Sequence, residues 1–249
     1  TVMVGVADNQ RLNRRGWPGL VGFVDAGVWN EPDFAERLSQ ACQTLQGCDE
    51  RSAVSERSQE AVDGLGAVRL IDCLELAVTG ALTAAGLTLT PFARLSEEDR
   101  RRVWRMRIHP EVSRWMATGG DISWDTHVRF MDGQAADTRN RNFLARDVAG
   151  VAGVASIHRI DRKARTGELG LYRNPERDER GLGGRLLDAI CGVAFDREGL
   201  RLFTLEVRRD NAAAIALYTR FGFRDTLLSR DEAMIEMSLS DHDWRGRTQ

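Results

Sequence analysis

Apolar residues follow two different rhythms along the chain, one in its first third and another in the remainder. Short continuous apolar runs at 1–7 and 20–27 are typical of buried parallel strands. Three predicted helices follow, the first and third with apolar residues at helical spacing, and Asn30 and Pro32 favour the start of the first one. This region predicts strands over 1–7 and 20–27 and helices over 30–46, about 51–63 and 64–78. These elements make up only part of an α/β sheet.

The second rhythm begins after a stretch of small residues over 80–86, which we expect to be a linker. Ser96 precedes three acidic residues, which is the signature of a capped helix. Short polar turns at 147–150 and 161–165 separate apolar strands and predict antiparallel hairpins. The segment predicts strands over 87–93, 142–148, 153–160, 166–174, 201–207 and 233–239, and helices over 96–107, 109–116, 125–134, from the glycine stretch to about 197, and within 210–223.

Length and composition indicate a globular protein with a sizeable core: 249 residues, 42% hydrophobic and 29% charged. The formal net charge of −2 gives no basic surface for nucleic acid, and no apolar run is long enough to span a membrane. The four cysteines follow no metal-ligand spacing and no signal peptide is visible, so we expect a cytoplasmic protein without a metal. The predicted organisation is a partial domain over 1–79, the linker 80–86, a domain over 87–241 and a polar tail over 242–249.

The stretch "DERGLGGRLLDAI" combines closely spaced glycines with the start of an apolar helix. Glycines allow backbone N–H groups to approach a ligand, and a helix N-terminus favours negative charge. The stretch therefore predicts either a phosphate cradle or an ordinary glycine-rich helix start. It lacks the Lys-Ser/Thr pair of a nucleotide P-loop, and hairpin strands precede it instead of a parallel βαβ unit.

The order of motifs resembles the GNAT superfamily of acyl-CoA-dependent N-acetyltransferases over about 87–240. A strand ending in "LGLYRNPE" leads to the glycine-rich loop, a helix, another strand and then "VRRDNAAAIALYTRFGF". The resemblance implies an α/β GNAT fold, with a mixed, mostly antiparallel central sheet and flanking helices, and acetyl-CoA as co-substrate without a metal. It departs from the family at Asp178, where a basic or amide residue is usual. The residues that it assigns to coenzyme A are His158, Arg159, Ile160, Arg180, Gly181, Leu182, Gly183, Gly184, Asn211 and Tyr218. In this assignment residues 157–160 form the edge that holds the pantetheine arm.

Within that superfamily, "VWRMRIHPEVSRWM", "ISWDTHVRF" and "GELGLYRNPE" resemble the N-acetyltransferases of pseudaminic acid biosynthesis. Those enzymes acetylate the 4-amino group of a UDP-4-amino-4,6-dideoxy sugar. The resemblance therefore implies a small-molecule nucleotide-sugar as acceptor. It places Arg107, Trp115, Met116, His127 and Glu168 on the acceptor side. Acetylation of a protein N-terminus or another small amine remains the alternative, as does a catalytically weak binding module.

Direct acetyl transfer requires a neutral amine, a polarised thioester carbonyl and a proton for the leaving sulfur. By resemblance, Tyr218 is the acid, and its other interpretation is core packing beside Leu217 and Phe221. His127, His158 and Glu168 compete for the role of base, and a water relay without a dominant base is a further possibility. Backbone N–H groups near 158–160 are the candidates for polarising the carbonyl.

The first third resembles the C-terminal end of the UDP-sugar hydrolase of the same pathway, a protein with a Rossmann-like GT-B fold. The resemblance rests on "GVADNQRLNRRGWPGLVGFVDAG" and "GLGAVRLIDCLEL", and it implies that the side chains of Asp8, Asn9, Gln10 and Asn13 contact a nucleotide-sugar. A capped helix start is the alternative for this stretch. Because the chain starts in mid-strand, we expect a fragment whose missing hydrolase region is a potential partner, alongside a homodimer. We predict no hydrolase activity for this chain.

Overall fold

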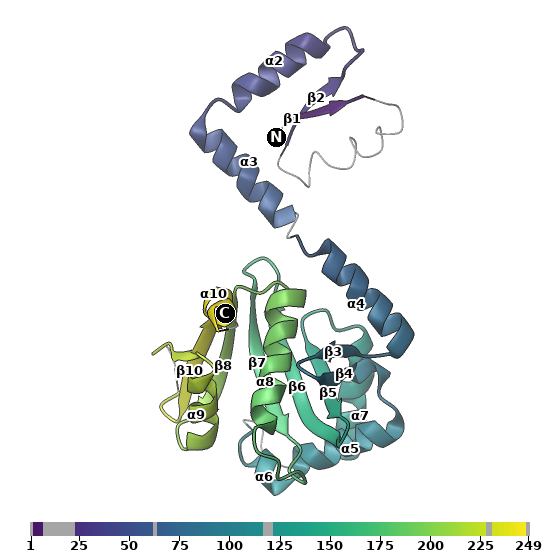
Figure 1. The fold of residues 1–249 in the computed structure, drawn as a ribbon, viewed down its shortest axis with the longest axis vertical. Coiled ribbons are helices and arrows are strands. Elements are labelled where there is room, and N and C mark those ends of the chain that lie inside the picture. The colour runs from purple at the N-terminus through teal and green to yellow at the C-terminus, as the bar shows by residue number, and fades with distance from the viewer. Residues whose placement is uncertain (1, 7–22, 62–63, 117–121, 228–230, 248–249) are drawn as a thin grey trace. The chain divides into compact units, whose positions relative to one another are not determined.

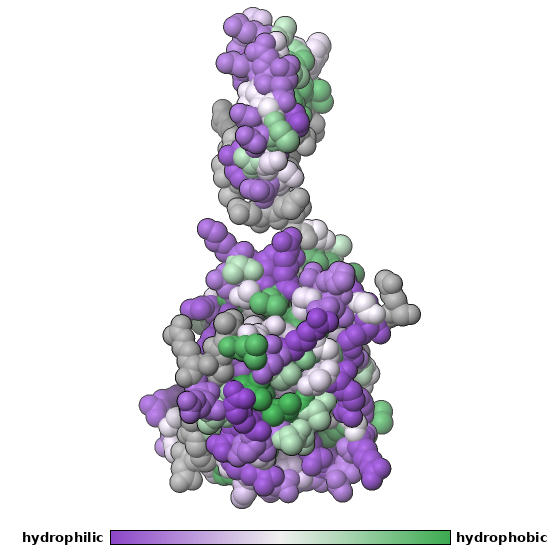
Figure 2. Space-filling model, turned by 90° about the vertical axis from the view of Figure 1, so that its left-hand side faces the viewer, coloured by the Kyte–Doolittle hydropathy of each residue, from purple (hydrophilic) through white to green (hydrophobic). Residues whose placement is uncertain are grey.

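The computed structural model describes residues 2–6, 23–61, 64–116, 122–227 and 231–247, which form two compact units over Thr1–Gly66 and Ala67–Gln249 (Figure 1). Each unit is considered separately. On the face seen in Figure 2, hydrophilic residues predominate and hydrophobic residues gather in small groups. None of the helices described is long and apolar enough to span a bilayer.

The first unit contains a two-stranded parallel sheet, made by β1 (Val2–Gly5) and β2 (Val24–Val28). Helix α2 (Phe34–Thr44) packs against β2 and buries Ala41, and α3 (Cys48–Ala61) follows it. Both predicted strands and both helices are present. The expected start of the first helix at Asn30 is wrong, because residues 29–33 form turns and a bend and Asp33 occupies the N-cap. The amide-rich stretch Asp8, Asn9, Gln10 and Asn13 lies outside the described residues.

The third predicted helix, α4 (Gly66–Thr79), belongs to the second unit rather than to the first. Its carboxylates hold Arg197: the distances from Nη1 are 2.5 Å to Asp72 and 3.3 Å to Glu75. Residues 80–86 include a strand, β3 (Leu82–Ala84), paired with the strand after it. The two units thus divide earlier than the sequence predicted, because long-range ion pairs attach α4 to the C-terminal unit.

An eight-stranded sheet forms the centre of the second unit, in the order β3-β4-β5-β6-β7-β8-β10-β9. All neighbouring strands are antiparallel except β7 and β8, which are parallel. The predicted hairpins and the mixed, mostly antiparallel sheet are therefore confirmed. The remaining strands are β4 (Leu87–Pro91), β5 (Arg141–Asp147), β6 (Gly150–Asp161), β7 (Thr166–Arg173), β8 (Leu202–Arg208), β9 (Arg224–Asp225) and β10 (Met234–Ser240).

Helices cover both faces of this sheet, and alternate strand residues point to each face. Phe143 and Ala155 join the core beneath α8 (Leu182–Gly192) and α9 (Ala212–Arg220), whereas Leu144 and Val154 join the core beneath α5 (Glu97–Ile108) and α7 (Trp124–Asp132). Ser96 caps α5 as predicted, and Ser123, which was not predicted as a cap, does the same for α7; each accepts a hydrogen bond from an N–H group in the first turn. The shorter helices are α6 (Pro110–Ser113), η2 (Phe92–Arg94), η3 (Gly133–Ala135) and η4 (Val193–Arg197).

The sequence predicts a polar tail over 242–249, and this prediction is wrong over 242–246. These residues belong to helix α10 (Asp241–Gly246), capped by Ser240. Trp244 is buried and stacks on Phe195 with ring centroids 5.9 Å apart, so one aromatic residue attaches an otherwise polar segment to the core.

Candidate active site

The two parallel strands of the sheet separate along their length. Pairing between β7 and β8 covers only three positions and ends at Glu168 and Thr204, although β7 continues to Arg173 and β8 to Arg208. Beyond this point β8 remains paired with β10 on its other side. The backbone groups of β7 past Glu168 therefore have no strand partner on this side and are available to a ligand. We call this gap between β7 and β8 the opening.

The glycine-rich stretch forms the N-terminus of α8, at the end of the opening where β7 stops. Gly181 is the N-cap residue with φ of 84°, a backbone conformation that favours glycine. A Cβ on Gly183 would lie 3.3 Å from Leu217 Cδ2, so α8 and α9 approach closely here. The first-turn N–H groups of α8 have no partner within a helix and carry partial positive charge. The predicted cradle residues Arg180, Gly181, Leu182, Gly183 and Gly184 are thus together at a position suited to a phosphate.

An ion-pair cluster that sequence reasoning missed holds the loop before α8. Asp147 accepts hydrogen bonds from Arg177 at 2.9 and 3.1 Å and from Arg185 at 2.9 Å. The bonds from Arg177 lower the pKa of Asp147 to about 2. Asn174 also donates to Val151 O at 3.0 Å. Asp147 and Arg177 are 30 residues apart, and each looks like an ordinary polar surface residue in the sequence. No local pattern therefore indicates their contact.

Residues 157–160 do not form the splayed edge that the resemblance assigned to them. They lie in β6, which pairs with β5 on one side and β7 on the other. Two of their N–H groups are already engaged: Arg159 N donates to Asn140 Oδ1 at 3.0 Å, and Ile160 N donates to Arg139 O at 2.8 Å. The predicted role of these two N–H groups at the thioester carbonyl is therefore wrong. Strands β6 and β7 stay paired as a hairpin. The gap lies instead between β7 and β8, which are parallel and connected through α8.

Tyr218 lies on α9, the helix that contacts the N-terminus of α8 through Leu217. The N-cap of α9 is Asn211, which accepts a hydrogen bond from Ala214 N at 3.2 Å. The ring of Tyr218 lies 5.8 Å from that of Phe223, and burial raises the pKa of its phenol to about 12. Tyr218 is therefore protonated at neutral pH and able to donate, and it also packs in the core, as both interpretations of the sequence required.

His158 and Glu168 form a cross-strand pair and point to the same face of the sheet. Glu168 makes an ion pair with Arg159 at 2.5 Å. His158 Nε2 lies 3.1 Å from Asn142 Oδ1, and burial, followed by the nearby Arg159, lowers the pKa of the imidazole. His158 is therefore a neutral imidazole at neutral pH, whereas the Glu168 carboxylate is already paired.

His127 is 5% exposed and lies in an aromatic cluster on α7. Its ring centroid is 5.9 Å from that of Trp124 and 6.5 Å from that of Phe130. Burial lowers the pKa of the imidazole, and Nε2 is buried with no hydrogen-bond partner among the residues described. The neighbourhood of His127 is therefore that of a core side chain.

The other acceptor-side residues are spread over the segment from α5 to α7. Arg107 is in the last turn of α5, where burial lowers its pKa, with Tyr172 of β7 nearby. Trp115 and Met116 follow α6 and are half-buried, and the guanidinium of Arg114 lies 5.0 Å from the Trp115 ring centroid. Arg107 and Tyr172 thus connect this segment to the strand that borders the opening.

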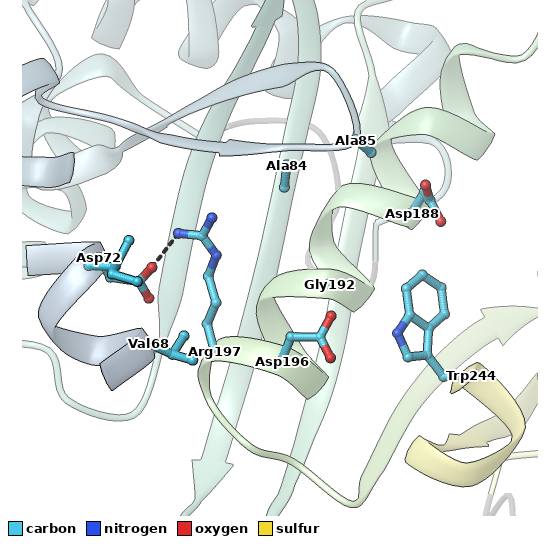
Figure 3. A pocket seen from close by; sticks show the side chains of 10 residues that line it. Val68, Asp72, Ala84, Ala85, Asp188, Gly192, Asp196, Arg197 and Trp244 are labelled. Carbon is cyan, nitrogen blue, oxygen red and sulfur yellow. Dashed lines mark hydrogen bonds and ion pairs between the residues drawn. The ribbon is translucent and has the colours of Figure 1, made fainter. Parts of the chain in front are cut away.

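A cavity of about 420 Å³ lies at the other end of α8, away from the cradle. Asp72 and Arg197 form an ion pair at its edge, and Asp188, Asp196 and Trp244 also line it (Figure 3). Asp188, the first α8 residue that lines it, is seven residues from Gly181, which is roughly 10 Å at 1.5 Å per residue. Within the described ranges, no three His, Cys, Asp or Glu side chains gather as metal ligands would.

Comparisons with known proteins agree with this geometry. The acetyltransferase (GNAT) family profile matches residues 93–223. Acetyltransferase PseH of Campylobacter jejuni is 32% identical over 139 residues, which is 55% of this chain and 84% of that protein. Its crystal structure in complex with acetyl coenzyme A has a TM-score of 0.51 at 20% identity and covers 62% of this chain and 98% of that one. Spermidine N-acetyltransferase of Vibrio cholerae, in complex with CoA and spermine, has a TM-score of 0.58 at 19% identity, covering 65% and 99%.

These matches fall on the second unit, which holds the parallel strand pair, the cradle and Tyr218. The family match spans the strands that border the opening as well as both helices beside the cradle. The cradle fits the acidic pyrophosphate of acetyl-CoA, the family's co-substrate. By fold, sequence and site, the chain belongs to the acetyltransferase (GNAT) family and is an N-acetyltransferase.

Proposed function

We propose that the chain transfers the acetyl group of acetyl-CoA to the 4-amino group of a UDP-amino-dideoxy sugar in the biosynthesis of pseudaminic acid, in the cytoplasm. The observation that carries this proposal is the likeness to acetyltransferase PseH, at 32% identity over 84% of that protein. The motifs around Arg107, Trp115 and His127 support the same acceptor, because they resemble those of the pseudaminic acid N-acetyltransferases.

Coenzyme A binding is assigned to the N-terminus of α8 and the free edge of β7. The N–H groups of Gly181 to Gly184 hold the pyrophosphate, and the Asp147–Arg177 pair keeps the preceding loop in place. Asp178 and Arg180 are exposed beside the cradle, so the backbone rather than the Asp178 side chain supplies the attraction. Unpaired N–H groups of β7 past Glu168 take the carbonyl-polarising role that 158–160 cannot fill.

The acceptor amine has to lose a proton before it can attack, and the surroundings of the three candidate bases differ. Glu168 is paired with Arg159, and His127 is 5% exposed among aromatic rings. His158 is neutral, and its Nδ1 makes no hydrogen bond with the described part of the chain. We assign the base to His158 and the acid that protonates the leaving sulfur to Tyr218, while Arg107, Trp115, Met116 and Glu168 border the sugar and the buried His127 packs behind them.

Release of coenzyme A thiol in the presence of a panel of amines tests the proposal. The panel contains the UDP-amino sugar, spermidine and a peptide with an N-terminal alanine, because [ribosomal protein bS18]-alanine N-acetyltransferase of Escherichia coli is 38% identical over 58 residues. We expect kcat/KM to be highest for the UDP-amino sugar. A higher kcat/KM for the peptide or the polyamine would replace the proposed acceptor, and no saturable coenzyme A binding would favour a binding module.

For the first unit we propose a relation to the C-terminal part of a UDP-sugar hydrolase, without hydrolase activity in this chain. Its support is the parallel pair β1–β2 with α2 against it, together with the sequence motifs. A homodimer is proposed as the assembly. Incubation with the UDP-sugar, followed by analysis of released UDP, tests the first statement, and light scattering tests the second.

A further inference from the structure

Three side chains on the acceptor face form a continuous chain of hydrogen bonds that starts at a backbone carbonyl. Gln134 Nε2 donates to Phe130 O at 3.3 Å. Asn142 Nδ2 donates to Gln134 Oε1 at 2.7 Å, and Asn142 Oδ1 lies 3.1 Å from His158 Nε2. We call these three residues, Gln134, Asn142 and His158, the amide relay.

The backbone carbonyl fixes the direction of every bond in the relay. A carbonyl only accepts, so the amide nitrogen of Gln134 has to face Phe130 and its oxygen has to face Asn142. That oxygen accepts from the nitrogen of Asn142, which turns Oδ1 of Asn142 toward His158. Asn142 Oδ1 is an amide oxygen without a hydrogen and can only accept a hydrogen bond. His158 Nε2 is therefore the donor and carries the proton.

We infer that Gln134 and Asn142 are positioning residues that hold the proton of the His158 imidazole on Nε2. The lone pair is thereby kept on Nδ1, and this nitrogen accepts a proton from the acceptor amine. This inference rests on the proposed function for its choice of acceptor, but the tautomer itself does not depend on the acceptor.

The relay places the imidazole beside the opening. A Cβ on Gly170 would lie 2.9 Å from His158 Cε1, so the ring stands directly over the backbone of β7. Gly170 comes two residues after Glu168, the last β7 residue paired with β8. Asn142 is 6% exposed, which protects the bond to Nε2 from water, whereas His158 itself is half-buried.

The charged groups around His158 agree with a neutral base. Arg159 lowers and Asp137 raises the pKa of the imidazole, and burial, the largest influence, lowers it. Glu168 faces His158 across the strands, and its charge is paired with Arg159. The amide oxygen of Asn142 brings no charge, so it selects a tautomer without stabilising the imidazolium as a carboxylate would.

In the reaction, His158 Nδ1 takes one proton from the acceptor ammonium and later releases it to solvent. The nitrogen lone pair then forms the new C–N bond to the acetyl carbonyl carbon as the C–S bond breaks. Tyr218 gives its proton to the leaving sulfur, and the second proton of the attacking nitrogen restores the phenol of Tyr218. The net reaction therefore converts an ammonium and a thioester into an amide, a thiol and one proton in solution.

The test is the ¹⁵N NMR spectrum of the full chain with labelled histidines, which distinguishes a protonated from an unprotonated ring nitrogen. His158→Gln identifies the signals of His158 among the four histidines. We expect Nε2 to be protonated and Nδ1 to be unprotonated at pH 7.5. A proton on Nδ1, or an even mixture, would overturn the inference.

Two variants of Gln134 separate the relay from general packing. Gln134→Met removes the acceptor for Asn142 Nδ2, so the amide of Asn142 is free to turn and the tautomer becomes mixed; we expect kcat/KM to fall about 10- to 100-fold. Gln134→Glu keeps an oxygen that accepts from Asn142, so it should retain the wild-type tautomer and most of the activity. Equal tautomers and equal kcat/KM in the two variants would overturn the positioning role.

Asn140→Ala is the matched control in the same neighbourhood. Asn140 bonds to Asp137 and to Arg159 N but not to the imidazole. We expect a lower melting temperature with the tautomer of His158 unchanged, and a tautomer shift equal to that of Gln134→Met would contradict the relay. Activities are measured with whichever amine the panel identifies, so a wrong acceptor refutes the proposed function and leaves the relay standing.

Discussion

The surroundings of His127 and His158 differ sharply, although both histidines lie on the same side of the sheet and burial lowers both pKa values. His127 is packed between Trp124 and Phe130, and its Nε2 has no hydrogen-bond partner in the part of the chain described. His158 has Nε2 in an oriented chain of amides and its ring over the strand that borders the opening. A lowered pKa alone therefore does not identify a base, and the partner of each ring nitrogen decides what the imidazole can do.

The largest effect that this comparison predicts is the loss of activity in His158→Gln. Removing a general base lowers the rate by about 10²- to 10⁴-fold, so kcat/KM should fall by that factor while the melting temperature changes little. Steady-state release of coenzyme A thiol measures it. If His158→Gln keeps full activity while His127→Leu loses it, the assignments of the two histidines have to be exchanged.

His127→Ala should have the next largest effect, and on stability instead of chemistry. Truncating a large core side chain leaves a cavity, and we expect a loss of about 2–4 kcal/mol in the free energy of unfolding. His127→Leu fills much of the space and removes a buried polar atom without a partner, so its stability should stay within about 1.5 kcal/mol of the wild type. Urea denaturation measures both variants, and equal losses would show that the ring has a polar role.

Tyr218→Phe tests the titratable group on the opposite face of the sheet. The phenol has a pKa of about 12 and stays protonated, so the variant loses only a donor. We expect kcat to fall about 10²-fold while the affinity for acetyl-CoA changes less than twofold. Isothermal titration with coenzyme A provides the affinity, and an unchanged kcat would leave Tyr218 as a packing residue beside Phe223.

Features set by neighbouring residues could be predicted from the sequence. Ser96 caps its helix as expected, the short turns give antiparallel hairpins, and the cradle residues around Gly181 gather at one helix N-terminus. His158 could be named as a candidate base because its residue type and its strand were visible.

Features that depend on partners distant in sequence could not be predicted. Strand β3 exists because Leu82 pairs with Leu89, and α10 is held by the contact of Trp244 with Phe195. The opening depends on where pairing between β7 and β8 stops, which no periodicity records. The relay joins residues 8 and 16 positions apart on different elements, so the orientation of each amide becomes visible only in three dimensions.

The smallest predicted effect is on the pH dependence of the free energy of unfolding. Its measurement needs no substrate and sharpens the comparison of His127 with His158. Burial is the largest influence on the pKa of His127 and lowers it. A hydrogen bond with the backbone of Arg100 opposes this, and the charges of Arg100 and Arg107 lower the pKa further, whereas an unfolded histidine titrates near 6.5. Between these two values the unfolded chain binds more protons, so the free energy of unfolding should fall as the pH falls below about 6.5. His127→Leu should flatten this slope between pH 5 and 7 by less than about 1.4 kcal/mol per pH unit, the limit for one proton. The kcat profile of the same variant should keep the acid limb that belongs to His158. Loss of that limb in His127→Leu would mean that the aromatic cluster, and not the amide relay, holds the titrating base.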